Sequence, residues 1–155
     1  AISDMCYSML KAPFGFPIES NSWSVTHTTS SGTQNNPNTA SYYNLGSAAL
    51  VLPIGDWNFS YNITFRINNG ATSTDRILKA YISNSSSSLS SSNAIVSGGF
   101  VGNYYYDSNA SGVLNYNVTS KTTKYLIFRA TNIAASGASI ELNSGGILKA
   151  TCAYL

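Results

Sequence analysis

The clearest pattern in the chain is a strict alternation of apolar and polar residues from position 57 to position 67, WNFSYNITFRI. Every second residue of this run is large and apolar, and the residues between them are Asn, Ser, Thr or Arg. Because the side chains of a β-strand point alternately to its two faces, this pattern predicts a long antiparallel strand with one buried face. The sequence NNG follows at 68–70 and is typical of a turn.

Shorter apolar runs recur along the rest of the chain, separated by Gly, Asn and Ser, whereas helical periodicity is almost absent. These runs predict eight further strands, at residues 23–29, 47–52, 76–83, 94–102, 112–119, 124–131, 138–143 and 146–155. Two segments, SSGTQNNPNTA (30–40) and SNSSSSLSSSN (83–93), are expected to be loops. Nine short strands joined by such turns predict an all-β fold, an antiparallel β-sandwich or barrel.

The length of 155 residues fits a single domain with a core of its own. Residues 1–20 contain two prolines and are expected to be a lead-in from a preceding shaft or domain. Residues 21–155 are expected to form the β-sandwich head. Cys6 and Cys152 lie near opposite ends of the chain, either as a disulfide between terminal strands or as two reduced, buried thiols.

Charge is sparse, at 9% of residues, and the net charge is +2. The eight Lys and Arg residues occur singly, and a nucleic-acid surface needs clustered cations, so no nucleic-acid partner is expected. No apolar run approaches the ~20 residues of a membrane span, so no membrane insertion is expected.

The residues that could carry catalysis are few: one His, two Cys, four Asp and two Glu. No G-x-S-x-G motif accompanies them, and no His or Cys pair has the spacing of a zinc site. The protein is therefore not expected to be an enzyme, and no cofactor or metal is implied.

Eleven tyrosines are the more informative feature, because a tyrosine ring combines an apolar face with a hydroxyl and so suits a sugar. Tyr61 and Tyr116 lie inside strand patterns and are expected to be core. The candidate ligand-binding residues lie in two segments, and they are Tyr104, Tyr105, Tyr106, Asp107 and Asn109 in the first and Tyr42 and Tyr43 in the second.

Within the tyrosine run, alternation from a buried Phe100 directs Tyr105 outward and Tyr104 and Tyr106 toward packing positions. Tyr105 would then lie beside a turn that contains Asp107 and Asn109. The glycines just before the run favour a bulge, which would invert this phase.

Four segments occur in an order that resembles the C-terminal domain of tail fibre and tail spike proteins of tailed bacteriophages. They are ALVLPIGDWNFSYNITFRI (49–67), AYISNSSSSL (80–89), TTKYLIFRAT (122–131) and GGILKATCAYL (145–155). The positions that match the pattern are Leu50, Leu52, Pro53, Gly55 and Trp57, then Ile82 and Ser83, then Thr122, Thr123, Tyr125, Leu126 and Ala130, and finally Gly145 and Gly146.

The resemblance implies a jelly-roll-like sandwich that assembles as a homotrimer at the distal tip of a fibre on the virion, joined to an upstream fibre shaft. It also implies attachment to a host cell through a bacterial cell-surface polysaccharide or an outer-membrane protein. Three alternatives stay open: a purely structural trimerisation or capping domain of a viral fibre or capsid decoration, a trimeric binding domain like C1q or tumour necrosis factor, and an accessory domain of a glycan-degrading enzyme.

Overall fold

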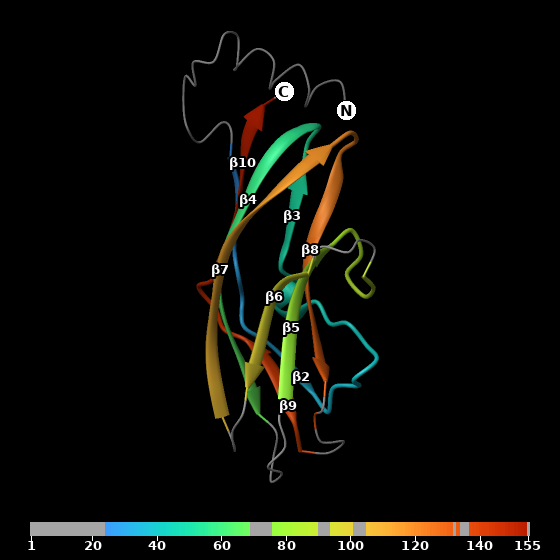
Figure 1. Cartoon of the computed structure of the whole chain (residues 1–155), viewed down its shortest axis with the longest axis vertical. Coiled ribbons are helices and arrows are strands. Elements are labelled where there is room, and N and C mark those ends of the chain that lie inside the picture. Colours follow the sequence, from blue (N-terminus) through green and yellow to red (C-terminus); the bar gives the residue numbers. More distant parts are fainter. Residues whose placement is uncertain are drawn as a thin grey trace.

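The computed structural model describes residues 24–68, 76–89, 94–100, 105–131, 133 and 137–154. Within these ranges the chain is all-β and forms two antiparallel sheets that lie face to face (Figure 1). The strands are β1 (Ser24–Thr28), β2 (Gly32–Asn35), β3 (Ala49–Leu52), β4 (Gly55–Asn68), β5 (Arg76–Ser83), β6 (Ala94–Phe100), β7 (Tyr105–Val118), β8 (Thr122–Thr131), β9 (Ser139–Leu142) and β10 (Ile147–Tyr154), with one 3-10 turn, η3 (Leu45–Ser47). No helix in the described part of the chain has the length and apolar character to cross a membrane.

Sheet A is built around the long strand β4. One edge of β4 pairs with β7 along the whole length of β4. The other edge of β4 pairs first with β10 and then with β9. β1 and β2 continue the sheet beyond β10 and β9. Sheet A therefore consists of four lines of strand, two of which are interrupted. Sheet B has the order β3-β8-β5-β6.

The pairings are nested like one long hairpin folded over on itself. β5 pairs with β6 and β4 with β7, then β3 with β8, and outermost β1–β2 with β9–β10. Distributing such a nested hairpin over two facing sheets of four strand lines produces a jelly roll. The sandwich expected from the sequence is therefore confirmed, and its connectivity is that of a jelly roll.

The corner between β3 and β4 carries the chain from sheet B to sheet A. Gly55 has φ 142°, a value that side chains other than hydrogen rarely allow, so the corner requires glycine there. The indole Nε1–H of Trp57 donates to the carbonyl of Pro53 at 2.9 Å, and the residue is only 5% exposed. Trp57 thus anchors the start of β4 in the core, as the sequence predicts.

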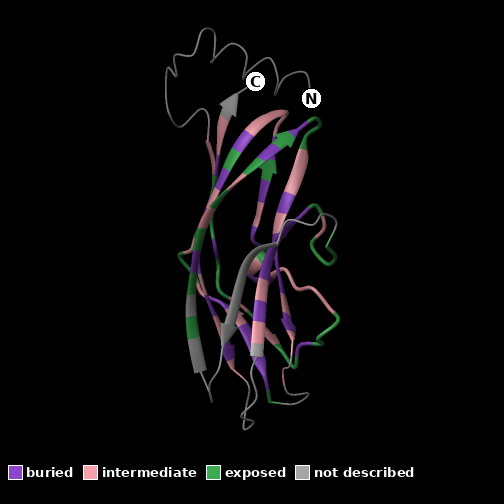
Figure 2. Ribbon diagram, viewed as in Figure 1, coloured by how far each residue is buried: buried purple, intermediate pink, exposed green. Residues whose placement is uncertain are grey.

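The core lies between the sheets and follows the alternation along β4 (Figure 2). The six apolar residues predicted to share one face are all buried: Trp57, Phe59, Tyr61, Ile63, Phe65 and Ile67. Phe65 meets Phe128 from the opposite sheet, with ring centroids 5.9 Å apart. Tyr116 packs edge-on against Phe59 at 5.9 Å, so the expectation that Tyr61 and Tyr116 belong to the core is confirmed.

Two sequence predictions about loops are wrong. The segment 30–40 contains β2, which the pattern does not reveal because GTQN is polar on both faces. The pairing of β2 with β9 supplies backbone hydrogen bonds that its side chains do not signal. The turn predicted to contain Asp107 and Asn109 lies within β7, which begins seven residues earlier than the predicted strand 112–119.

The turn was predicted in place of a strand because the inward residues near the middle of β7, Ala110 and Gly112, are small. Ala110 is buried, and a Cβ on Gly112 would lie only 2.3 Å from the Tyr61 hydroxyl. The large Tyr61 ring from β4 therefore requires glycine opposite it, and small residues resemble a turn in the sequence. The predicted strand 94–102 is observed over Ala94–Phe100. The predicted lead-in at 1–20, and with it Cys6, lies outside the described residues.

Candidate ligand site on the outer face of sheet B

The segment between β2 and η3 lies along the edge of β8 that β3 leaves open. Tyr43 exchanges two backbone hydrogen bonds with Phe128, of 2.9 and 2.8 Å. The side-chain amide of Asn44 donates to the carbonyls of Ala48 and Leu126 at 2.9 and 2.7 Å. We refer to residues 36–44 as the edge loop. These bonds hold the edge loop against the outer side of sheet B.

Arg129, on β8, is the side chain that the edge loop surrounds. Its Nε–H donates to the carbonyl of Thr39 at 2.8 Å, and its Nη1 donates to the Tyr42 hydroxyl at 3.3 Å. The guanidinium carbon lies 5.5 Å from the centre of the Tyr42 ring. Tyr42 in turn packs edge-on against Tyr81 of β5, at 5.6 Å between centroids. A cation and an aromatic ring are therefore held in a defined arrangement at the surface.

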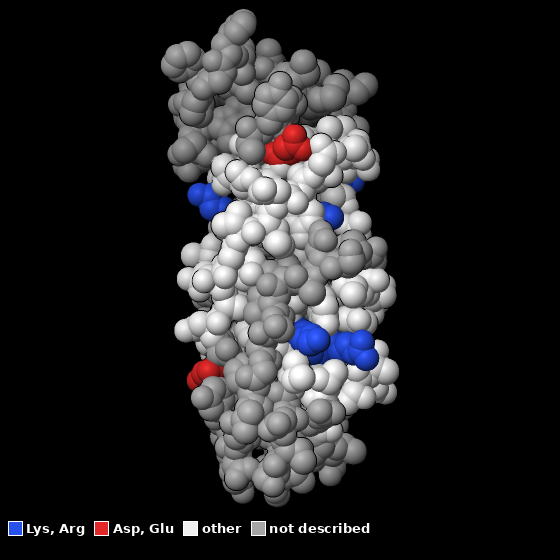
Figure 3. Space-filling model, viewed as in Figure 1, with Lys and Arg blue, Asp and Glu red and all other residues white. Residues whose placement is uncertain are grey.

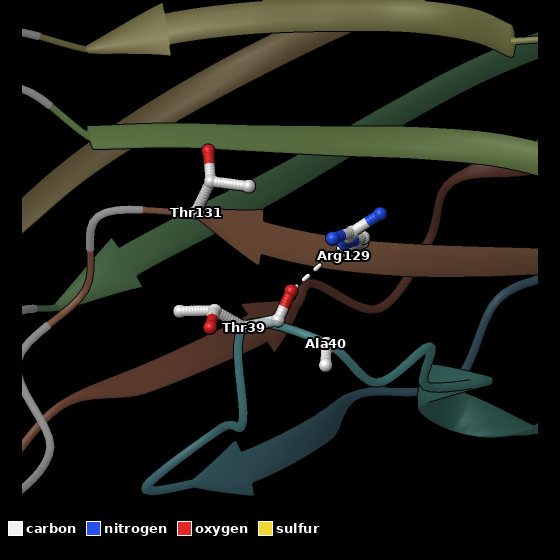
Figure 4. A pocket seen from close by; sticks show the side chains of 4 residues that line it. All are labelled: Thr39, Ala40, Arg129 and Thr131. Atoms are coloured by element: carbon white, nitrogen blue, oxygen red, sulfur yellow. Dashed lines mark hydrogen bonds between the residues drawn. The ribbon is translucent and has the colours of Figure 1, made fainter.

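A shallow hollow of about 310 Å³ opens beside this arrangement, lined by Thr39, Ala40, Arg129 and Thr131 (Figure 4). Thr39 and Ala40 come from the edge loop, and Arg129 and Thr131 come from β8. The lining residues carry a guanidinium, two hydroxyls and three methyl groups. These groups can donate hydrogen bonds to a polar ligand and contact its apolar edges, and the described residues of the lining include no carboxylate and no imidazole.

Of the two tyrosines predicted in this region, Tyr42 borders the hollow through its contacts with Arg129. The Tyr43 hydroxyl instead accepts a 2.8 Å hydrogen bond from the backbone N–H of Asn38, within the edge loop. Tyr43 also packs against the core. Its contacts thus support the loop, while those of Tyr42 form part of the surface.

The candidates Asp107 and Asn109 lie elsewhere, on the outer face of sheet A. Asp107 receives two hydrogen bonds from Arg66, of 2.6 and 2.9 Å, and these lower the pKa of its carboxyl. Asn109 accepts a hydrogen bond from the hydroxyl of Thr64. Both residues are exposed and form cross-strand pairs with β4. The sequence candidates therefore do not form one site, because they divide between the two sheets.

The rest of the tyrosine run is described only in part. The backbone of Tyr105 lies opposite Asn68, and that of Tyr106 lies opposite Ile67. The side chains of both residues, and all of Tyr104, lie outside the described residues. The proposed outward direction of Tyr105 stays a prediction.

Sequence reasoning missed the residues that define the hollow, above all Arg129. A partial signal was present, because Arg129 occupies a polar position between the buried residues Phe128 and Ala130 of β8. That alternation places Arg129 on the outer face, but it does not show that the edge loop lies above it.

Comparisons with known proteins support the fold alone. No protein-family model matches the chain, and no curated protein matches it. Dimeric latent PorU from Porphyromonas gingivalis has a similar structure, with a TM-score of 0.50 and 8% identity over 84% of this chain and 13% of that one. The structure of the Gx strain of infectious bursal disease virus matches with a TM-score of 0.43 and 11% identity, over 83% of this chain and 31% of that one. The chain thus spans a minor part of each of these proteins.

Proposed function

We propose that this chain is the receptor-binding head of a bacteriophage tail fibre and that the edge loop and β8 form its receptor site. The observation that carries the proposal is the placement of Tyr42 and Arg129 at the surface beside the hollow, held by hydrogen bonds to the loop and by the Tyr81 ring. Loops on a rigid sandwich are a frequent location of binding sites. The order of segments that resembles tail fibre heads supports the phage assignment.

The chemistry of the site favours a bacterial surface glycan over an apolar ligand. The hollow is shallow and is lined by hydroxyls and a guanidinium, and a tyrosine ring lies at its border. Such a site binds one sugar weakly. In the proposed homotrimer three copies would act together, and effective concentration would raise the avidity by roughly 10²-fold or more without any new contact.

The proposal is tested with the fluorescently labelled chain and a panel of bacterial strains. We expect it to bind some strains, and we expect extracted surface polysaccharide to compete better than outer-membrane vesicles stripped of polysaccharide. Tyr42→Ala should remove most of the binding without loss of the folded state, measured by circular dichroism. Asn109→Ala, on sheet A, is the matched control and should bind like the wild type.

The outcomes separate the function from the placement of the site. If Asn109→Ala lost binding and Tyr42→Ala kept it, the receptor site would lie on sheet A and our placement would be wrong. If the chain bound no strain and did not block adsorption of a phage that carries it, the receptor-binding function itself would be wrong.

A purely structural trimerisation domain is the second candidate, and one observation favours it. Val113 on β7 and Ile147 on β10 are 66% and 46% exposed on the outer face of sheet A, on either side of β4. Exposed apolar residues on an otherwise polar face suit a subunit interface. Sedimentation equilibrium tests this role: if Val113→Lys converts a trimer to a monomer while cell binding per subunit persists, sheet A serves assembly and sheet B serves binding.

A further inference from the structure

The two sheets differ in charge. Sheet A contains three carboxylates, on Asp56, Asp107 and Glu141, and two cations, on Arg66 and Lys149. The strands of sheet B contain no Asp or Glu, but they carry four cationic residues, Arg76, Lys79, Lys124 and Arg129, of which Lys124 points into the sandwich. In a chain with so few charges, this separation gives sheet B a positive field.

Two of these cations lie side by side on the outer face. Lys79 of β5 and Arg129 of β8 are direct cross-strand partners. Their neighbours in each strand, Leu78, Ala80, Phe128 and Ala130, are completely buried in the core, so both cations point away from it. Figure 3 shows a group of neighbouring Lys and Arg side chains at mid-height with no acidic side chain next to it on the visible face, while other Lys and Arg side chains lie apart from this group.

A pair of like charges directly opposite each other is unfavourable unless something neutralises it. The ion pairs among the described residues join Arg66 to Asp107 and Glu141, and neither Lys79 nor Arg129 takes part in them. The partners that Arg129 has in the described structure, Thr39 and Tyr42, are uncharged. The pair therefore retains its attraction for an anion.

One of the two residues lines the hollow, and the other is its neighbour in the sheet. Arg129 lines it, and Lys79 is the residue next to Arg129 across the sheet. A guanidinium matches the geometry of a carboxylate or phosphate, and a lysine ammonium adds a flexible second charge. Thr39, Thr131 and the Tyr42 ring supply the neutral contacts that a sugar ring would need.

We infer that the site on sheet B binds an anionic saccharide, with its acidic group between Lys79 and Arg129 and its ring against the edge loop. This inference rests on the proposed receptor site and specifies its ligand class. The acidic group is a carboxylate, as in a uronic acid, or a phosphate, as in a phosphorylated surface polymer, since both accept the same hydrogen bonds.

Isothermal titration calorimetry on the whole chain tests the inference with three probes: a galacturonic acid tetramer, a neutral galactose tetramer, and galactose 6-phosphate with inorganic phosphate as its reference. We expect at least one acidic sugar to bind about tenfold more tightly than the neutral tetramer and to lose affinity as salt rises, since the Debye length shortens. The tighter of the two acidic sugars identifies the acidic group.

Three variants provide the controls. Lys79→Gln should weaken the binding of the acidic sugar about fivefold to tenfold, and Lys79→Glu should abolish it, because the new carboxylate would pair with Arg129. Lys149→Gln removes an exposed cation from sheet A and should leave the affinity unchanged. Lys79 is chosen for substitution because Arg129 also holds the edge loop.

Three results would overturn the inference: neither acidic sugar binding more tightly than the neutral tetramer, equal loss in Lys79→Gln and Lys149→Gln, or no binding of any acidic sugar. Inorganic phosphate that binds as tightly as galactose 6-phosphate would overturn the role of the sugar ring. The proposed function is tested separately. If cells bind the Lys79→Glu variant normally, this inference is wrong and the receptor-binding function stands. If the chain binds acidic sugars but no bacterial cell, the receptor-binding function is wrong and this inference stands.

Discussion

The ammonium nitrogen of Lys124 lies 4.5 Å from the centre of the Tyr116 ring, so a cation of β8 contacts an aromatic ring of β7 across the sandwich. Lys124 belongs to the inward row of β8 that continues with Leu126 and Phe128, and it is 9% exposed. Its Nζ donates to Oδ1 of Asn84 at 2.7 Å. Burial lowers the pKa of Lys124, because the charged form is poorly solvated there.

The first prediction follows from this burial. Between the lowered pKa of Lys124 in the folded state and 10.5 in the unfolded state, the unfolded chain binds more protons. The free energy of unfolding should therefore rise with pH through that window. Urea denaturation should be measured below about pH 9, where the tyrosines are mostly protonated. Lys124→Met should remove this rise and should be neutral or stabilising at pH 7; a rise that persists in the variant would contradict the assignment to Lys124.

The second prediction concerns Asp107 and Arg66 on sheet A. The hydrogen bonds from Arg66 hold the pKa of Asp107 below 3.8, so this contribution to stability is present at neutral pH and is lost as the pH falls through the lowered value. Because the Asp107 side chain is 50% exposed, Asp107→Asn should cost less than about 1 kcal/mol at pH 7. Chemical denaturation of Asp107→Asn, Arg66→Met and the double variant would measure the coupling. Loss of cell binding in Asp107→Asn with unchanged stability would instead indicate a ligand role.

The third prediction compares two glycines with positive φ. Gly46 has φ +62°, and a Cβ there would lie 2.2 Å from the carbonyl oxygen of Ser30, whereas Gly145 has φ +84° with nothing within 4 Å. Gly145→Ala should therefore cost only the backbone strain, about 1 to 2 kcal/mol. Gly46→Ala adds a backbone clash and should cost about 3 kcal/mol or more. Thermal unfolding of both variants measures how much stability each substitution loses. Equal losses would show that η3, which contains Gly46, moves away from Ser30 without penalty.

The fourth prediction concerns Thr29, which lies at the break between β1 and β2 and is 2% exposed. Its hydroxyl donates to the carbonyl of Asn143 at 3.0 Å and accepts from the N–H of Gly146 at 2.9 Å. Thr29→Val leaves both backbone groups without this partner and should cost about 1 to 3 kcal/mol. Thr29→Ser keeps the hydroxyl and is the control. A cost for Thr29→Ser as large as that for Thr29→Val would attribute the effect to the lost methyl group.

Local pattern predicted the sandwich because each long strand has one buried face. The alternation from Trp57 to Ile67 identifies both the strand and the face, since the period of two belongs to the backbone itself. The corner at Pro53 and Gly55 was equally readable, because its residues restrict φ directly. These features do not depend on which strand is the neighbour.

The local pattern did not predict a strand where pairing with a neighbouring strand, and not the segment's own side chains, decides the conformation. β2 is polar on both faces and is a strand because β9 pairs with it. Gly112, near the middle of β7, leaves room for the Tyr61 ring and resembles a turn residue in the sequence. Asp107 and Asn109 lie in the sheet because their strand pairs with β4. Neither condition is visible in the segment itself.

By itself, the sequence determined that the chain forms strands, which of their faces are buried and that two tyrosines lie near a loop. Only the tertiary structure decided that Lys79 lies beside Arg129, that the edge loop holds Arg129 against Tyr42, and that the sequence candidates separate onto two sheets. The physical reason is that periodicity is a property of one segment. Strand neighbours are chosen by the burial of all the apolar faces together, over contacts between residues far apart in the chain.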